Sequence, residues 1–148
     1  MNDDLTILYQ EVILDHSRDP RNFGPAEDAN REAKGNNPLC GDRVTIYLRL
    51  DSGLIADAKF EGRGCAISLA SASMMTEMIK GMSEEAARDL FERFHALVTD
   101  GNGGDADLEE LEALSGVRRF PTRIKCATLA WHAMTAALDQ LEDEIKTE

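Results

Sequence analysis

The segment 44–60 constrains the fold more than any other part of this chain. Within 44–50, apolar side chains alternate with more polar ones at a period of two, which is typical of a strand with one buried face. The turn signal Asp51-Ser52-Gly53 follows, and residues 55–60 have the composition of a returning strand. The pattern therefore predicts an antiparallel hairpin and not a βαβ unit.

Helical periodicity replaces strand periodicity after Gly64. Residues 66–80 are rich in Ala, Ser and Met, which predicts a helix packed closely against the sheet. Ser83 precedes two glutamates and is typical of a helix N-cap. The apolar spacing, with Pro121 in the first turn of the last helix, predicts helices over 4–17, 84–98, 108–114 and 121–141 and a short strand within 29–36. We expect an exposed loop at 100–105 and a frayed tail over 142–148.

Length and charge narrow the possibilities further. The chain has 148 residues, enough for one domain with a substantial core and too few for two, so we expect a single domain over 1–148. It carries 28 acidic and 16 basic residues, for a net charge of −12. That balance argues against general nucleic-acid binding and against docking on anionic membranes. No uncharged apolar run has the length of a membrane span.

Three cysteines lie far apart in the sequence. Between Cys40 and Cys65 there are 24 residues, and between Cys65 and Cys126 there are 60. An odd count does not fit a disulfide framework, and the acidic first residues, with no apolar stretch after them, do not resemble a signal peptide. We therefore expect a cytoplasmic protein whose thiols are reduced or bound to metal.

Each cysteine is predicted to lie at the end of a helix or strand. Glycines and polar residues surround Cys40 and Cys65, which argues against plain core positions, whereas Cys126, followed by Ala127, fits a core position better. Asp42 adds a carboxylate two residues after Cys40. Three thiolates and one carboxylate make four ligands, enough for a tetrahedral zinc site or for one end of an iron–sulfur cluster. We expect helix N-termini to stabilise the thiolates. The neighbouring glycines would let the backbone approach a sulfur–metal centre without a Cβ clash; they are Gly41, Gly62 and Gly64.

Every ligand segment also has a basic neighbour, although the chain as a whole is acidic. These residues are Arg43, Arg63, Arg123 and Lys125. They are placed where they would offset the negative charge of a metal bound to thiolates, or guide an anionic partner. Chance placement on the surface is the competing interpretation.

Several segments together resemble the IscU/NifU-N-terminal family of iron–sulfur cluster assembly proteins. The opening residues 8–16, with Pro20-Arg21-Asn22-Phe23-Gly24, are similar to the start of that family. Its three ligand loops resemble residues 37–42, 60–73 and 123–127 here, in the same order. The resemblance implies an α+β fold with a small antiparallel sheet of about three strands and helices packed on it, which agrees with the hairpin pattern.

Two features resemble the SufU branch of the family. Lys125 precedes the third cysteine, where IscU-type scaffolds have histidine. The stretch between the second and third cysteines is also longer than in those scaffolds, with the extra residues around 94–107. The resemblance implies a Zn²⁺ site formed by Cys40, Asp42, Cys65 and Cys126. It also implies a zinc-dependent sulfur acceptor that takes persulfide sulfur from a SufS-type cysteine desulfurase, with other SUF assembly proteins as further partners.

Within this interpretation Cys40 is the candidate sulfur acceptor, because its glycine-flanked loop is expected to be the most mobile and the SufU pattern indicates the same residue. The main alternative is a scaffold or carrier on which a [2Fe–2S] cluster is assembled. A purely structural zinc domain is a third possibility, although such sites usually use closely spaced ligand pairs. A cysteine hydrolase would need one of the three histidines as its base: His16, His95 or His132.

Overall fold

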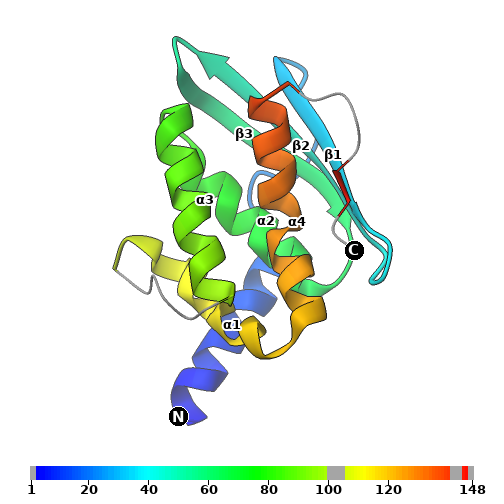
Figure 1. Ribbon diagram of the computed structural model, residues 1–148, viewed down its shortest axis with the longest axis vertical. Helices are drawn as coiled ribbons and strands as arrows, with labels where there is room; N and C mark the ends of the chain where they lie inside the picture. Colours follow the sequence, from blue (N-terminus) through cyan, green and yellow to red (C-terminus); the bar gives the residue numbers. More distant parts are fainter. Residues whose placement is uncertain (1–2, 100–105, 141–144, 147–148) are drawn as a thin grey trace.

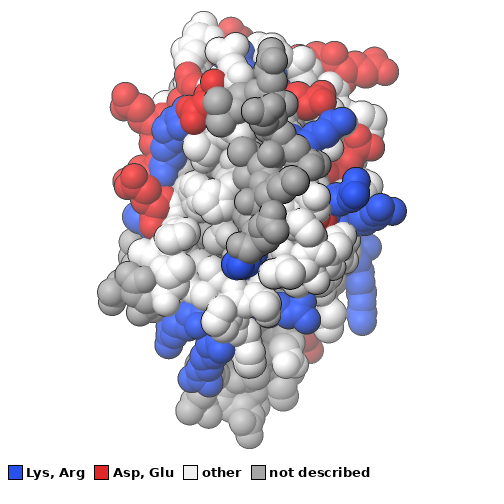
Figure 2. Space-filling model, turned by 45° about the vertical axis from the view of Figure 1, so that its right-hand side comes forward, with Lys and Arg blue, Asp and Glu red and all other residues white. Residues whose placement is uncertain are grey.

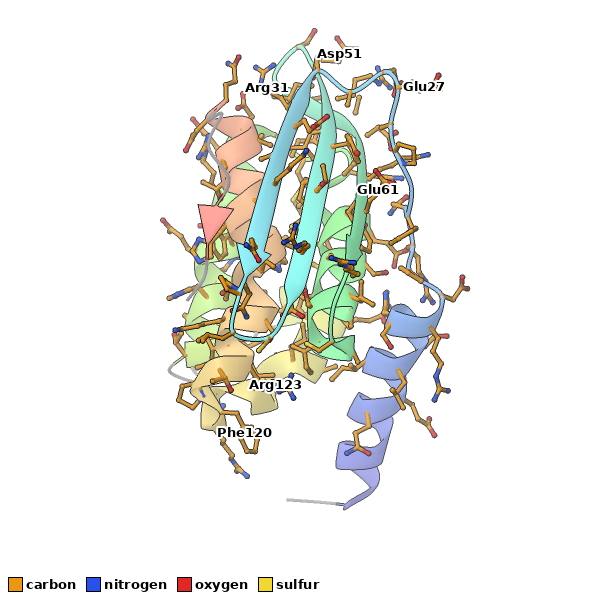
Figure 3. All side chains as sticks on the ribbon, turned by 90° about the vertical axis from the view of Figure 1, so that its right-hand side faces the viewer. Glu27, Arg31, Asp51, Glu61, Phe120 and Arg123 are labelled. Atoms are coloured by element: carbon orange, nitrogen blue, oxygen red, sulfur yellow. The ribbon has the colours of Figure 1, made fainter. Side chains whose placement is uncertain are left out.

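The computed structural model describes residues 3–99, 106–140 and 145–146. Its helices are packed against one face of a single sheet, so the molecule has two layers (Figure 1). After a turn of 90° about the vertical axis, the sheet lies in front of the helices, and no described helix covers its outer face (Figure 3). The fold is the predicted α+β arrangement of a small antiparallel sheet with packed helices.

The sheet has the strand order β3-β2-β1-β4. Its three long strands are β1 (Arg31–Asn37), β2 (Asp42–Asp51) and β3 (Leu54–Arg63), and they pair antiparallel in sequence order. The predicted strands and hairpin are therefore confirmed. A two-residue strand, β4 (Ile145–Lys146), pairs parallel with β1 at Gly35–Asn36. This pairing differs from the predicted frayed tail; the remaining tail residues lie outside the described residues, as does the predicted loop at 100–105.

The β2–β3 turn is determined by the backbone conformations of its own residues. Ser52 and Gly53 both have positive φ, 55° and 81°. Two successive left-handed residues are the signature of the type I′ turn, whose twist matches that of the paired strands. Gly53 adopts this conformation without the steric penalty of a Cβ. The turn therefore follows directly from the residues that form it.

The buried core lies between the sheet and the helices α2 (Ala66–Ile79) and α4 (Pro121–Leu138). Both helices are buried on most of their faces, which explains their many Ala and Ser residues: small side chains let the backbones approach closely. Trp131 of α4 is fully buried, and its indole N–H donates to Ser71 Oγ of α2 at 3.0 Å. This bond satisfies the one polar group of the largest core side chain.

Two further helices follow their predicted positions. In α3 (Glu84–Thr99), the backbone N–H of Ala86 donates to Ser83 Oγ at 3.1 Å, so Ser83 is the predicted N-cap. The helix α1 (Asp3–Arg18) packs on α2 through its second half, where Val12 and Ile13 are partly buried. The side chains of its predicted stripe at residues 5, 8 and 9 lie outside the described residues.

The predicted short helix at 108–114 is a longer 3₁₀ helix, η1 (Ala106–Arg119). Its buried side chains include Ala113 and four residues that recur every three positions: Leu108, Leu111, Leu114 and Val117. A 3₁₀ helix has three residues per turn, so this spacing keeps all four on one face. Within the part of the chain that the structure describes, no helix is both long and apolar enough to cross a bilayer.

Candidate metal centre

The three cysteine segments meet at one end of the sheet. Cys40 lies in the β1–β2 turn, Asp42 is the first residue of β2, Cys65 is the N-cap of α2, and Cys126 lies in the second turn of α4. One ligand atom each from Cys40, Asp42 and Cys126 lies within 4.8 Å of the others. We call these three residues and Cys65 the cysteine cluster.

Asp42 connects Cys65 to the rest of the cluster. The carboxylate is fully buried, and its Oδ1 accepts the backbone N–H of Cys65 at 2.9 Å. Its other oxygen, Oδ2, lies 3.9 Å from the Cys65 sulfur. A buried carboxylate needs such partners, because desolvation without compensation is costly. Asp42 therefore holds the start of α2 against the start of β2.

Gly64 makes this approach possible. A Cβ at residue 64 would lie 2.2 Å from Asp42 Oδ1, and the backbone there has φ +153°. Both facts require glycine. From the sequence, this glycine is expected to make room for a metal centre; in the structure it makes room for the Asp42 carboxylate of the cysteine cluster. Gly62 has a different role, because a Cβ there would lie 2.5 Å from the backbone oxygen of Arg43 in the neighbouring strand.

The β1–β2 turn is held by Asn37. Its carbonyl oxygen accepts the N–H groups of Cys40 at 3.2 Å and Gly41 at 2.9 Å. Gly41 has φ +72°, which favours glycine. Cys40 is half-buried, and Leu39 beside it has 66% of its surface exposed. The turn backbone is thus fixed while the Cys40 side chain stays close to solvent.

Asn37 also reaches the third cysteine with its side chain. Its Nδ2 lies 3.6 Å from the sulfur of Cys126, and its buried Oδ1 has no hydrogen-bond partner among the described residues. The Cys126 side chain is fully buried, and its sulfur lies 3.5 Å from the carbonyl oxygen of Thr122. No sequence pattern indicated this contact with Cys126, because an Asn before Pro is typical of a turn.

The thiols of Cys65 and Cys126 are not equivalent. A hydrogen bond from the Cys126 thiol lowers the pKa of Cys65 to about 6, against the opposing effect of burial, and the N–H groups of Ser68 and Ile67 at the start of α2 add to the lowering. The Cys65 thiolate, together with burial and Asp42, raises the pKa of Cys126. In the metal-free chain one proton therefore stays on Cys126 and a thiolate forms at Cys65, as expected at a helix N-terminus.

Among the four predicted basic neighbours, Arg123 is coupled to the cluster. Its pKa is raised by a hydrogen bond with Cys126 and by the negative charge of Cys65. Arg43 and Arg63 are instead exposed and lie opposite each other in the β2–β3 register. Strand alternation puts Arg43 on the open face, away from its buried neighbour Asp42. For these two residues the predicted role, to offset the charge of a metal site or to guide a partner, stays a prediction.

A groove of about 670 Å³ lies beside the cluster, with Arg123 on its wall. Its other lining residues include Ile13, Ile67 and Phe120, and Phe120 has 60% of its surface exposed. In Figure 3, the labelled Phe120 and Arg123 lie beyond the same end of the sheet as the β1–β2 turn. On the face drawn in Figure 2, most Asp and Glu lie in the upper half, and Lys and Arg predominate in the lower half.

The three histidines lie apart from the thiols in the described structure. His16 hydrogen-bonds to Ser73 and Glu110, and His132 packs against Phe91 with ring centroids 5.0 Å apart. Burial, together with the charge of His95, lowers the pKa of His132. Within the described residues, the hydrogen bonds and ring contacts of these histidines involve no cysteine, so the geometry gives no support to a cysteine hydrolase.

The donor set fits a soft, four-coordinate metal centre. Thiolates select zinc or iron–sulfur clusters over hard cations, and the carboxylate provides a fourth donor. The atoms that now share protons across the cluster are those that a metal ion would bind in their place. The α+β fold thus carries a candidate metal site at one end of its sheet.

The family model for the NifU-like N-terminal domain matches residues 8–148, and the chain belongs to this family. It is 48% identical over 134 residues to the zinc-dependent sulfurtransferase SufU of Bacillus subtilis, with 90% of each chain covered. It is 42% identical over 135 residues to the iron–sulfur cluster assembly scaffold protein IscU of Streptococcus pyogenes, with 90% of this chain and 84% of the relative covered.

A solved structure shows the same fold. It is the crystal structure of a protein from Fervidobacterium islandicum AW-1 proposed as an iron–sulfur cluster assembly scaffold protein for the SUF system. That protein is 35% identical to this chain. The two superpose with a TM-score of 0.82, covering 89% of this chain and 97% of the other. The family assignment from the sequence motifs is therefore confirmed.

Proposed function

We propose that this protein is a zinc-dependent sulfur acceptor in iron–sulfur cluster assembly, which takes persulfide sulfur from a SufS-type cysteine desulfurase in the cytoplasm. Zn²⁺ would be held by Cys40, Asp42, Cys65 and Cys126. The convergence of these four side chains at one end of the sheet carries the proposal. The similarity to a zinc-dependent sulfurtransferase over 90% of the chain supports it.

Cys40 is the proposed acceptor because it is the thiol that can leave the cluster at the lowest cost. Cys126 is fully buried in α4, and the backbone of Cys65 is bonded to Asp42. Cys40 is half-buried, and its turn is held through backbone bonds to Asn37. Rotation of the Cys40 side chain therefore moves its sulfur without breaking the turn.

The transfer itself balances as a thiol–persulfide exchange. The thiolate of Cys40 attacks the terminal sulfur of the desulfurase persulfide, the sulfur–sulfur bond of that persulfide breaks, and the desulfurase cysteine leaves as a thiolate. Cys40 then carries the persulfide. Bound zinc would keep the thiols ionised at neutral pH. Arg123 is placed to offset the negative charge of the thiolates during this exchange.

The surface around Cys40 supports docking of a partner protein. Leu39 and Phe120 are exposed apolar side chains near the cluster, and the adjoining groove carries arginines. Apolar anchors bordered by positive charge suit a partner with an acidic rim. The desulfurase and other SUF assembly proteins are the proposed partners for this surface.

The second candidate function is a scaffold for a [2Fe–2S] cluster, which the IscU relatives favour. The same four side chains would then bind the cluster. Elemental analysis with a visible spectrum of the purified protein separates the two functions. Stoichiometric zinc without colour supports sulfur transfer, and a brown protein with iron and sulfide supports the scaffold.

A further inference from the structure

A second group of metal-ligating side chains lies outside the cysteine cluster. It consists of His16 from α1, Glu77 from α2 and Glu110 from η1, and we call it the His16 cluster. One ligand atom from each lies within 4.8 Å of the others. His16 is 1% exposed, while both glutamates reach solvent. Three separate elements thus bring an imidazole and two carboxylates together.

A chain of hydrogen bonds fixes the orientation of the His16 ring. The backbone N–H of Arg21 donates to Ser73 Oγ at 2.8 Å, and Ser73 Oγ lies 2.7 Å from His16 Nδ1. On the other side of the ring, His16 Nε2 lies 2.8 Å from Glu110 Oε2. Metal-binding histidines are oriented in this way, with the second ring nitrogen bonded to a protein group.

His16, Glu77 and Glu110 line a cavity of about 560 Å³. Much of the remaining wall is apolar, formed by Met74, Met78, Met82 and Leu90. There is room for an ion together with water ligands at the positions that the protein leaves open. Sites with few protein ligands and open positions are common for divalent transition metals.

The nearby positive charges are held by other carboxylates. Arg21 lies 2.6 Å from Asp15 but 4.0 Å from Glu77. Arg93, which also lines the cavity, lies 3.1 Å from Asp89. Both arginines are thus shared with a carboxylate outside the His16 cluster, Asp15 or Asp89.

We propose that the His16 cluster binds a divalent first-row transition-metal ion through His16 Nε2 and one oxygen each of Glu77 and Glu110. Imidazole and carboxylate together suit Zn²⁺, Co²⁺ or Fe²⁺. The ion takes the place of the proton between His16 and Glu110, and the ring then donates from Nδ1 to Ser73 Oγ. This site shares no residue with the cysteine cluster, so it does not depend on the proposed function.

Titration of the metal-free full chain with Co²⁺ tests the proposal. Cobalt at the cysteine cluster gives intense sulfur-to-metal charge-transfer absorption, whereas cobalt at a histidine and two glutamates gives only weak bands. We expect two equivalents per chain, one with each signature. Absence of the weakly absorbing equivalent, with or without the charge-transfer band, would overturn the proposal.

Variants assign the second equivalent to its residues. Glu110→Gln and Glu77→Gln replace exposed side chains, and each should weaken the second equivalent by about tenfold or more while the charge-transfer band of the first stays unchanged. Glu112→Gln, on the same helix but outside the cluster, is the matched control and should bind as the wild type does. Equal binding by all three variants contradicts the assignment. Loss of the charge-transfer band alone would contradict only the cysteine cluster.

Discussion

At one end of the sheet, β2 and β3 are joined by Asp51-Ser52-Gly53. At the other end, the β1–β2 turn carries Cys40 and the β3–α2 junction carries Cys65, and Cys126 of α4 lies beside them. The first end is formed by consecutive residues with the φ values of a type I′ turn. At the second end, Asp42 must meet the backbone of Cys65, and Asn37 must meet Cys126, 89 residues further along.

This difference shows where the chain depends on tertiary structure. The end that carries the β2–β3 turn, the hairpin end, has no buried ionisable group among its described residues. The end that carries the cysteine cluster, the cysteine end, buries a carboxylate, a thiol and an unpartnered amide oxygen. Buried polar groups are costly unless they are bonded or bound to metal. We therefore expect the cysteine end to be the functional region and the one more sensitive to substitution, and five experiments test that expectation.

The largest expected effect is on sulfur transfer. Cys40→Ala removes the proposed acceptor, so it should abolish stimulation of a SufS-type desulfurase while the fold persists. Mass spectrometry after brief mixing with desulfurase and cysteine should find the persulfide of the wild-type chain on Cys40. Full stimulation by Cys40→Ala, with the persulfide on Cys65 or Cys126 only, would reassign the acceptor and leave the zinc proposal intact.

The unequal thiols predict unequal reactivity in the metal-free chain. Because the pKa of Cys65 is lowered to about 6, its thiolate persists through neutral pH and is lost as the pH falls through about 6. The raised pKa of Cys126 keeps that thiol protonated. Alkylation followed by peptide mapping should therefore show Cys65 reacting at pH 7 with a midpoint near 6, and Cys126 unreactive. A Cys65 midpoint near 8.5, the value of an unperturbed thiol, would contradict the proton sharing.

Two glycine substitutions compare the ends directly. Gly64→Ala puts a methyl group against Asp42 and should lower the free energy of unfolding by about 3 kcal/mol. At Gly53 no atom lies within 4 Å of the added Cβ, so Gly53→Ala is opposed only by the positive φ. It should lower the free energy of unfolding by about 1 kcal/mol. Urea denaturation of both variants measures the difference. Equal losses of unfolding free energy would show that the cysteine end is no more sensitive to substitution than the hairpin end.

Metal removal should act on one end of the sheet. A chelator should lower the melting temperature by about 5 °C, because the proposed zinc ion would connect ligands from distant segments. Hydrogen exchange should then accelerate at residues 37–42 and 64–66 and stay unchanged at 51–54. Identical melting of the zinc-bound and zinc-free chains would remove the structural contribution of the metal.

The smallest expected effect concerns charge beside the cluster. Arg123→Glu should reduce desulfurase stimulation about fivefold, since it reverses a charge coupled to the thiolates. Arg43→Glu, on the open face of the sheet, is the matched control and should change stimulation by less than about twofold. If both variants behave alike, Arg123 is an ordinary surface residue and the groove beside it is not the docking surface.

Some structural details were predictable from patterns that the sequence analysis did not use fully. The period of two in β2 already separates Arg43 from Asp42, so the exposure of Arg43 on the other face follows from alternation. The spacing of three from Leu108 to Val117 likewise indicates a 3₁₀ helix. The pairing of β4 with β1 had no such signal, because two residues are too short for any periodicity.

The sequence by itself determined the hairpin, the Ser83 cap, the helical segments and the family, because each depends on neighbouring residues or on motifs in a set order. Tertiary structure alone decided how Gly64 accommodates Asp42, how Asn37 reaches Cys126, which thiol keeps the proton, and how His16 comes to lie beside Glu110. The physical reason is that these contacts join residues 22 to 94 positions apart. Their energies depend on distances of a few ångströms, which no local pattern specifies.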